Sequence, residues 1–143
     1  MDLIELVRSA PWYKLIGMEP HLVEDRVVVE LNISRTKHFQ ALGVAHGGVI
    51  ASVLDSVIGL NVNKELLQRG KVAVTVQLNI HYLKPALEGK IIGEGKVVHV
   101  GSKIVVGYGE VKNSRGEIIA TGTATYYITG ESPIPQDRAD LEC

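Results

Sequence analysis

Alternation of apolar and polar residues recurs along this chain and predicts β-strands. From Arg26 to Ser34 every second residue is Val, Leu or Ile, which predicts a strand with one buried face. The alternation returns from Lys71 to Lys84. Three more strand-like segments follow without a helix between them: residues 90–100, 103–112 and 117–129. The short turns between these segments favour an antiparallel sheet.

An almost wholly apolar segment with helical character precedes the long strands. The predicted helix begins near Gly47-Gly48 and ends at about Leu67, with Gly70 as its stop signal. Its circumference is mostly apolar, so we expect the helix to be enclosed. One side carries small or polar residues at helical spacing: Gly48, Ser52, Asp55, Ser56, Gly59 and Asn63.

Asp55 is the one charged residue in the first four turns of this helix. An ionised side chain in an apolar interior costs several kcal/mol unless a partner compensates it. Asp55 is therefore the first candidate for a functional residue.

The remaining segments are predicted to be short or irregular. Residues 2–9 form a short amphipathic helix that Pro11 ends. Residues 12–18 are a connector, a turn lies around Glu24-Asp25, and residues 35–45 are a loop leading to the long helix.

Small residues recur at alternate positions of the last three strands: Gly93 and Gly95, Gly107 and Gly109, then Ala120, Gly122 and Ala124. Glycine weakens a strand unless another part of the chain must approach closely. The pattern therefore indicates a sheet that curls tightly around the enclosed helix. The predicted fold class is α+β, with an antiparallel sheet curled around one long central helix.

Length and composition set further bounds. The 143 residues fit one domain, expected over residues 1–129, and the charged, proline-containing end at 130–143 is expected to be a mobile tail. A net charge of −1 and 5% aromatic residues argue against nucleic-acid binding. The apolar segment is too short to span a membrane. The single cysteine, Cys143, and an N-terminus unlike a signal peptide lead us to expect a cytoplasmic protein.

The order of strand, His46-Gly47-Gly48 helix and long antiparallel strands resembles the hotdog fold. The spacing from that motif to Asp55 is similar to the phenylacetic-acid-degradation/thioesterase 4-like family of acyl-CoA thioesterases, over roughly residues 12–129. Further similarities are the spacing from Gln40 to His46 and three segments: VTVQLNIHYLKPA (74–86), HVGSK (99–103) and GEIIATGTATYYI (116–128).

The resemblance implies hydrolysis of an acyl-CoA thioester. Asp55 would act as general base or as nucleophile, and the residues leave both roles open. The unpaired N–H groups at a helix start favour developing negative charge, so Gly47 is the expected oxyanion donor, with Gly48 beside the substrate. Gln40 would orient water or the carbonyl group, and Thr75 matches a family hydroxyl near the acid. His46 is expected to fix the loop by hydrogen bonding.

Four residues are candidates for contact with coenzyme A. His99, Ser102 and Lys103 match the family's turn, and Lys84 is a looser candidate for the phosphates. No metal is implied, because the five histidines never pair with a second ligand at binding spacing, and no cofactor is expected. His21, His38 and His81 are interpreted as surface or strand residues.

Asp55 lies about 10 Å along the helix from Gly48, at 1.5 Å per residue. Both groups cannot reach one carbonyl within a single chain, since each must lie about 3 Å from the reacting atoms. The spacing thus predicts a site shared across a homodimer, or a dimer of dimers. A non-catalytic acyl-CoA-binding module and a hotdog dehydratase remain alternatives. Families with Asp at this helix position often have Asn where this chain has Gln40, so the acyl group stays open.

Overall fold

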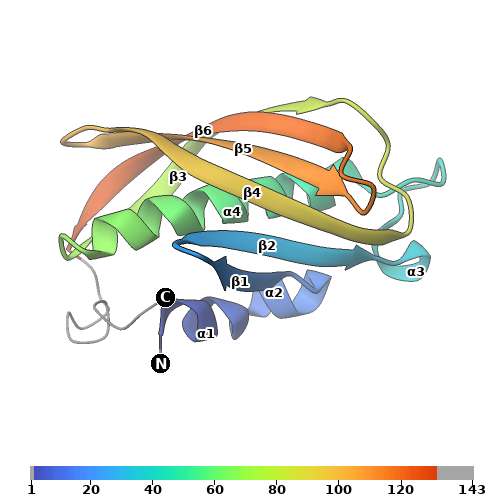
Figure 1. The fold of residues 1–143 in the computed structure, drawn as a ribbon, viewed down its shortest axis with the longest axis horizontal. Helices are drawn as coiled ribbons and strands as arrows, with labels where there is room; N and C mark the ends of the chain where they lie inside the picture. Colours follow the sequence, from blue (N-terminus) through green and yellow to red (C-terminus); the bar gives the residue numbers. More distant parts are fainter. Residues whose placement is uncertain (1, 132–143) are drawn as a thin grey trace.

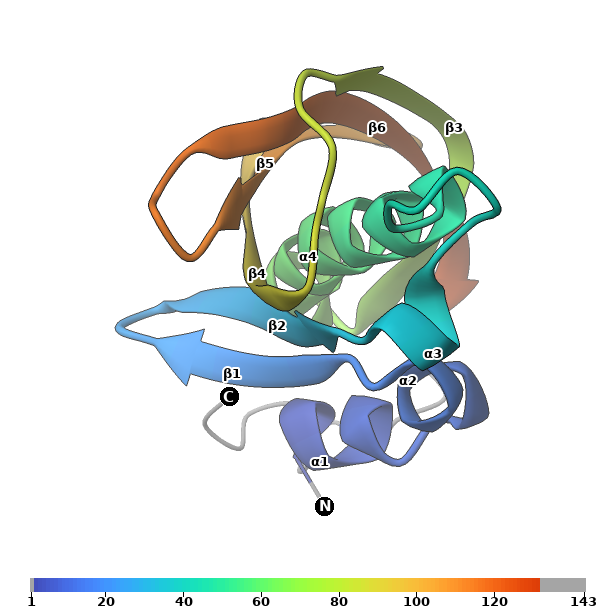
Figure 2. The same ribbon diagram turned by 90° about the vertical axis from the view of Figure 1, so that its right-hand side faces the viewer.

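A curved six-stranded sheet wraps around helix α4, Gly47–Leu67, in the computed structural model, which describes residues 2–131 (Figures 1 and 2). All neighbouring strands are antiparallel, in the order β1-β2-β4-β5-β6-β3. The strands are β1 Glu19–Val23, β2 Arg26–Ile33, β3 Lys71–Tyr82, β4 Gly89–Val100, β5 Ile104–Asn113 and β6 Ile118–Glu131. Three short helices precede α4: α1 Leu3–Arg8, α2 Pro11–Ile16 and α3 Arg35–His38.

The predicted long helix, the antiparallel sheet and the turn at Glu24-Asp25 are confirmed. Gly70 adopts a left-handed φ of 67° just beyond α4, as expected of a helix stop. Strand β6 runs to Glu131, two residues beyond the predicted domain end at 129. The rest of the predicted tail lies outside the described residues. None of the described helices is long and apolar enough to cross a membrane.

Three elements differ from the prediction. Strand β1 was not expected, and it forms a hairpin with β2. The predicted connector at 12–18 contains α2, because Pro11 is the first residue of a new helix instead of only the end of the previous one. The predicted loop at 35–45 begins with the single turn of α3.

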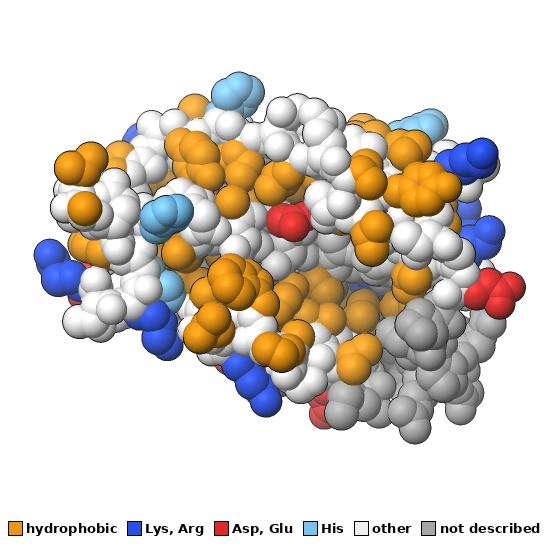
Figure 3. Space-filling model, turned by 180° about the vertical axis from the view of Figure 1, so that it is seen from behind, with side chains coloured by type: hydrophobic (Ala, Val, Ile, Leu, Met, Phe, Trp, Pro, Cys, Tyr) orange, Lys and Arg blue, Asp and Glu red, His pale blue; other side chains and the backbone are white. Residues whose placement is uncertain are grey.

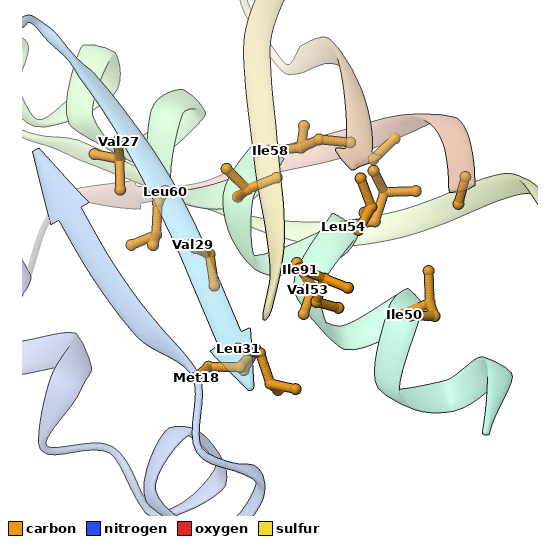
Figure 4. Packing of buried hydrophobic residues seen from close by; sticks show 14 of the residues in the cluster. Met18, Val27, Val29, Leu31, Ile50, Val53, Leu54, Ile58, Leu60 and Ile91 are labelled. Carbon is orange, nitrogen blue, oxygen red and sulfur yellow. The ribbon is translucent and has the colours of Figure 1, made fainter. Parts of the chain in front are cut away.

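The sheet approaches α4 closely because glycines line its inner surface. A Cβ at Gly93 would lie 2.8 Å from Cγ1 of Val53, and one at Gly109 would lie 2.9 Å from side-chain atoms of both Leu54 and Ile58. Ile58 is fully buried, and Figure 4 shows it with Leu54 among the surrounding strands. The predicted role of the small residues is confirmed at these positions.

Two asparagines attach α4 to strands on opposite sides of the helix. The Asn61 amide accepts from the N–H of Val27 at 3.0 Å and donates to its carbonyl at 2.8 Å. The Asn63 amide makes the same pair of bonds to Ala73, at 2.8 and 3.1 Å. Each amide also donates to the carbonyl four residues earlier in α4. These bonds fix the rotation of the helix relative to β2 and β3.

The uninterrupted alternation predicted for β3 is broken by a bulge. The pairing with β6 shifts between Thr75 and Gln77, which leaves Val76 without a partner in the register. Val74 and Val76 are therefore 53% and 58% exposed, whereas Leu78 packs against the core. Thr75, just before the bulge, faces α4 and bonds to Asp55.

We expect Gly122→Ala to destabilise the fold by about 1–3 kcal/mol, the usual cost of overpacking. A Cβ at Gly122 would meet the main-chain oxygen of Asn79 and would lie 2.6 Å from Cδ2 of Leu54. Urea unfolding measures the loss. Thr121→Ala, on the adjacent residue, is the control and should cost less than about 1 kcal/mol. Equal losses for both variants would contradict this account of the close approach.

Candidate functional site

Asp55 is half-buried on α4, and its side chain is held by two hydroxyl groups. Thr75 Oγ1 donates to Asp55 Oδ1 at 2.8 Å, and Tyr126 Oη donates to the same oxygen at 3.0 Å. The structure thus brings Asp55 and Thr75 together, as the sequence analysis expected. Oδ2 receives no hydrogen bond from residues 2–131. One carboxylate oxygen is therefore anchored, and the other is available to a bound molecule.

A cavity of about 490 Å³ begins at this carboxylate. Its polar lining includes Asp55, Thr75, Tyr13 and Tyr126, and its apolar lining comes from α1, α4 and β3: Leu3, Val7, Leu60, Leu67, Val72 and Val74. Figure 3 shows apolar side chains gathered around a hollow, with an acidic side chain among them. The cavity can hold an apolar group whose reactive end lies at Asp55.

Burial affects two tyrosines that face Asp55. Removal from water is the largest cause that raises the pKa of Tyr126, and the Asp55 charge raises it further. Burial also raises the pKa of Tyr13, to which the Asp55 charge adds. Both phenols therefore stay neutral near pH 7, so the Tyr126 hydroxyl remains a hydrogen-bond donor.

The start of α4 is capped by His46. Its Nδ1 accepts from the N–H of Gly48 at 2.8 Å, in agreement with the expected loop-fixing hydrogen bond. The N–H of Gly47 has no acceptor within the described chain, whereas the Gly47 carbonyl accepts from Tyr82 Oη at 2.9 Å. The Gly48 N–H is thus occupied, whereas the Gly47 N–H is unpaired within the described chain.

Gln40 lies in the loop before α4 and is bonded locally. Its main-chain N–H donates to the carbonyl of Val44 at 2.8 Å, and its side-chain oxygen accepts from the N–H of Leu42. Within the described chain, no hydrogen bond links Gln40 to Asp55. In this structure the Gln40 side chain stabilises the turn, and its role toward substrate stays a prediction.

The coenzyme A candidates lie at two ends of the molecule. Lys84 forms an ion pair with Glu117 and lies near the start of α4, where the N–H of Ala45 donates to the carbonyl of Ala86 at 2.9 Å. His99, Ser102 and Lys103 are exposed around the β4–β5 turn, at the end of the sheet near the C-terminus of α4 (Figure 1). A single chain does not bring Lys84 to that turn.

The interpretation of His38 as a surface or strand residue was wrong. His38 is 4% exposed and belongs to α3. Its Nδ1 accepts from the N–H of Ser34 at 2.9 Å, and its Nε2 lies 2.7 Å from the carbonyl oxygen of Ile16. His38 thus fastens the loop before α4 to the end of α2.

Tyr126 is the site residue that the sequence analysis missed. Its signal was present, because Tyr126 continues the alternation of Ala120, Gly122 and Ala124 on the inner face of β6. This alternation predicts that the Tyr126 side chain points inward, but it does not reveal which group the hydroxyl bonds to. Among the described residues, no group of three or more His, Cys, Asp or Glu side chains is placed to hold a metal ion.

Residues 42–120, more than half of the chain, match the family model of the thioesterase superfamily. This chain belongs to the thioesterase superfamily. The match includes the start of α4, Asp55 and most of the long strands, and it confirms the resemblance to hotdog thioesterases.

Several named proteins are similar to this chain in sequence. A protein of Archaeoglobus fulgidus, named provisionally as an esterase, is 36% identical over 69% of this chain and 62% of its own length. Another such protein, from Saccharolobus solfataricus, is 34% identical over 80% and 77%. The medium/long-chain acyl-CoA thioesterase YigI of Escherichia coli is 32% identical over 62% and 64%. This chain therefore spans less than two thirds of the Archaeoglobus and Escherichia relatives.

Solved structures support the fold. A Bacillus halodurans protein crystallised with CoA has a TM-score of 0.79 and 31% identity, over 90% of this chain and 88% of that one. A Haemophilus influenzae thioesterase has a TM-score of 0.81 at 19% identity, over 91% and 92%. At that identity the second similarity concerns the fold alone.

We expect His46→Ala to lower the free energy of unfolding by about 1 kcal/mol, because the N-cap acceptor of Gly48 is lost. His46→Asn should retain most of the stability, since Asn is among the best capping residues. Thermal and urea unfolding of both variants measure the effect. A His46→Asn variant as unstable as His46→Ala would show that capping is not the role of this side chain.

Proposed function

We propose that this chain hydrolyses acyl-CoA thioesters to a free acid and coenzyme A, with Asp55 as general base or nucleophile. The observation that carries the proposal is the Asp55 carboxylate itself. Its Oδ1 is anchored by Thr75 and Tyr126, and its Oδ2 is left open beside an apolar cavity. An anchored carboxylate beside an apolar pocket supplies a base or nucleophile next to space for an acyl chain, and thioester hydrolysis can use both.

Two of the similar proteins support the coenzyme A ester as substrate. The Escherichia coli relative carries the name medium/long-chain acyl-CoA thioesterase, and the Bacillus halodurans structure contains CoA. The apolar lining of the cavity suits the acyl chain of such an ester.

The reaction balances in either of two ways. As base, Asp55 takes a proton from water, the resulting hydroxide attacks the thioester carbonyl, and the C–S bond breaks as the thiolate leaves and is protonated. As nucleophile, Asp55 forms a mixed anhydride with the acyl group and releases the thiol, and water then hydrolyses the anhydride. Neither route needs a metal or cofactor.

The proposed oxyanion donor is the Gly47 N–H of a second copy of the chain. Gly48 and Asp55 are about 10 Å apart along one helix, too far to act on one carbonyl. Strand β3 is an edge of the sheet, and its Val74 and Val76 are more than half exposed. Exposed apolar edges favour pairing with another strand. Antiparallel pairing of two β3 edges would bring the start of one α4 toward the middle of the other.

The same pairing suits the coenzyme A candidates. Because it reverses the second copy, the Lys84 end of one chain would lie beside the end that carries the partner's β4–β5 turn. Lys84 of one chain and His99, Ser102 and Lys103 of the other would then contact the same coenzyme A molecule. Gly48 would line the site of the thioester carbonyl.

Asp55→Asn tests the activity. It keeps the side-chain shape and an oxygen for Thr75 and Tyr126, but it removes the base, so kcat should fall by at least about 10²-fold. Thiol release from CoA esters of short, long and aromatic acids gives the rates, with unfolding and sedimentation as controls for fold and assembly. Hydrolysis near the native rate would refute the role of Asp55.

The acyl-CoA-binding module remains the alternative outcome of this experiment. If the native chain binds acyl-CoA tightly in calorimetry but releases no thiol from any ester of the panel, the chain is a binding module and the proposal of hydrolysis fails.

Gly47→Pro tests the oxyanion donor. Gly47 is the first residue of α4, where proline is well tolerated, and His46 already has the extended backbone that proline requires before it. The variant removes the N–H and should lower kcat by about 10²–10³-fold. Gly47→Ala is the matched control, because it adds a Cβ 3.3 Å from the Tyr82 ring but keeps the N–H. Similar losses in both variants would contradict the role of the N–H.

Mixing the two inactive variants tests whether the site is shared. In a mixed dimer, Asp55→Asn chains supply an intact Gly47, and Gly47→Pro chains supply an intact Asp55, so one of the two sites is complete. Refolding or co-expressing the two should therefore restore a substantial part of the activity. No recovery in a sample shown to contain mixed dimers would mean that each site lies within one chain.

A further inference from the structure

The inner face of β6 changes character at its tyrosine. Ala120, Gly122 and Ala124 are small and buried against α4, and the next inward residue is Tyr126, which is 2% exposed. A ring of that size needs space on the helix. Gly59 provides it, because a Cβ at Gly59 would lie 3.2 Å from both Cε1 and Oη of Tyr126.

The Tyr126 hydroxyl contacts two oxygens of the same residue. Oη lies 2.9 Å from the main-chain oxygen of Asp55 and 3.0 Å from its Oδ1. A single hydroxyl between the main chain and the side chain of Asp55 restricts rotation of that side chain on the helix. A partner that bonded the carboxylate alone would restrict it less.

The second donor to the carboxylate comes from the other strand beside the cavity. Thr75 on β3 reaches Oδ1 at 2.8 Å, and Thr75 is the register partner of Tyr126 in the β3–β6 pair. Two neighbouring strands therefore hold the same oxygen. Because both hydroxyls bind Oδ1, they orient the carboxylate and leave Oδ2 as its reactive oxygen.

We propose that Tyr126 is a positioning residue for the Asp55 carboxylate, and that Gly59 is glycine so that the Tyr126 ring can reach it. The inference rests on the proposed hydrolysis. Tyr126 acts through Asp55: it anchors Oδ1 from inside the fold and fixes the direction in which Oδ2 meets water or the thioester carbonyl. Gly59 is thereby assigned a function in the site: the absence of a Cβ makes room for the Tyr126 ring. Close packing of small residues alone would not explain why position 59 is Gly while position 56 is Ser.

Tyr126→Phe tests the inference, because it removes the hydroxyl and keeps the buried ring. A hydrogen bond to a charged group is worth enough that kcat should fall about 10-fold to 100-fold. KM should change less than about 3-fold, since the hydroxyl does not hold the acyl chain. Tyr127→Phe is the matched control: Tyr127 is the next residue, is 44% exposed, and should leave both constants unchanged. A native kcat in Tyr126→Phe would overturn the inference.

The Asp55→Asn background separates positioning from a general structural role. If Tyr126 acts only through the carboxylate, adding Tyr126→Phe to Asp55→Asn should leave the residual kcat unchanged. The residual rate is measured at an enzyme concentration that brings it above the uncatalysed rate. An equal fall in both backgrounds would show that Tyr126 acts independently of Asp55 and would overturn the inference.

The role of Asp55 and the positioning role of Tyr126 give different results in these variants. If Asp55→Asn itself hydrolyses the ester at the native rate, the proposed function of Asp55 fails. If Asp55→Asn is impaired but Tyr126→Phe is not, only the positioning role fails. A Tyr126→Phe variant that loses kcat together with much of its unfolding free energy, and that regains kcat on cooling, would point to a loosened fold and would also overturn the positioning role.

Discussion

The distance between the sheet and α4 is the constraint on which this structure depends. Glycines on β4, β5 and β6 allow the strands to contact the helix where any side chain would collide with it. The helix is consequently buried along most of its surface, and the side that carries Asp55 is the part left partly open. A charged residue at Leu54 or Ile58 would be fully removed from water, since both positions are 0% exposed. The same close packing that stabilises the fold therefore decides where an acid can be placed.

Rotation of the helix is fixed as firmly as its position. Asn61 and Asn63 pair with both main-chain groups of Val27 and Ala73, respectively, on opposite sides of the helix. A helix held on both sides presents its open stripe in one direction, toward β3 and the N-terminal helices. Polar residues inside the fold thus orient the site, although none of their atoms needs to meet a substrate.

The sequence predicted the parts of the fold that repeat and missed those that depend on one contact. Alternation and the long apolar segment identified α4 and the long strands, because each pattern extends over ten or more residues. Strand β1 was missed because Pro20 and charged neighbours hide a short strand, and α2 because Pro11 can end one helix or begin the next. Asp55 was identified as the one charge in an apolar helix, and Thr75 by resemblance. Their contact lies next to the bulge at Val76, which alternation cannot reveal, and the hydroxyl of Tyr126 finds its partner only in three dimensions.

The two edges of the sheet differ in a way that limits polymer growth. Strand β3 offers exposed valines at one edge, whereas the opposite edge, β1, contains Pro20 and has Glu19 and His21 on either side of it. Proline has no N–H to donate, and the charge of Glu19 opposes strand addition. A dimer paired through β3, as proposed above, would present only β1 edges to further copies. Growth of such an assembly by strand addition would end at two copies.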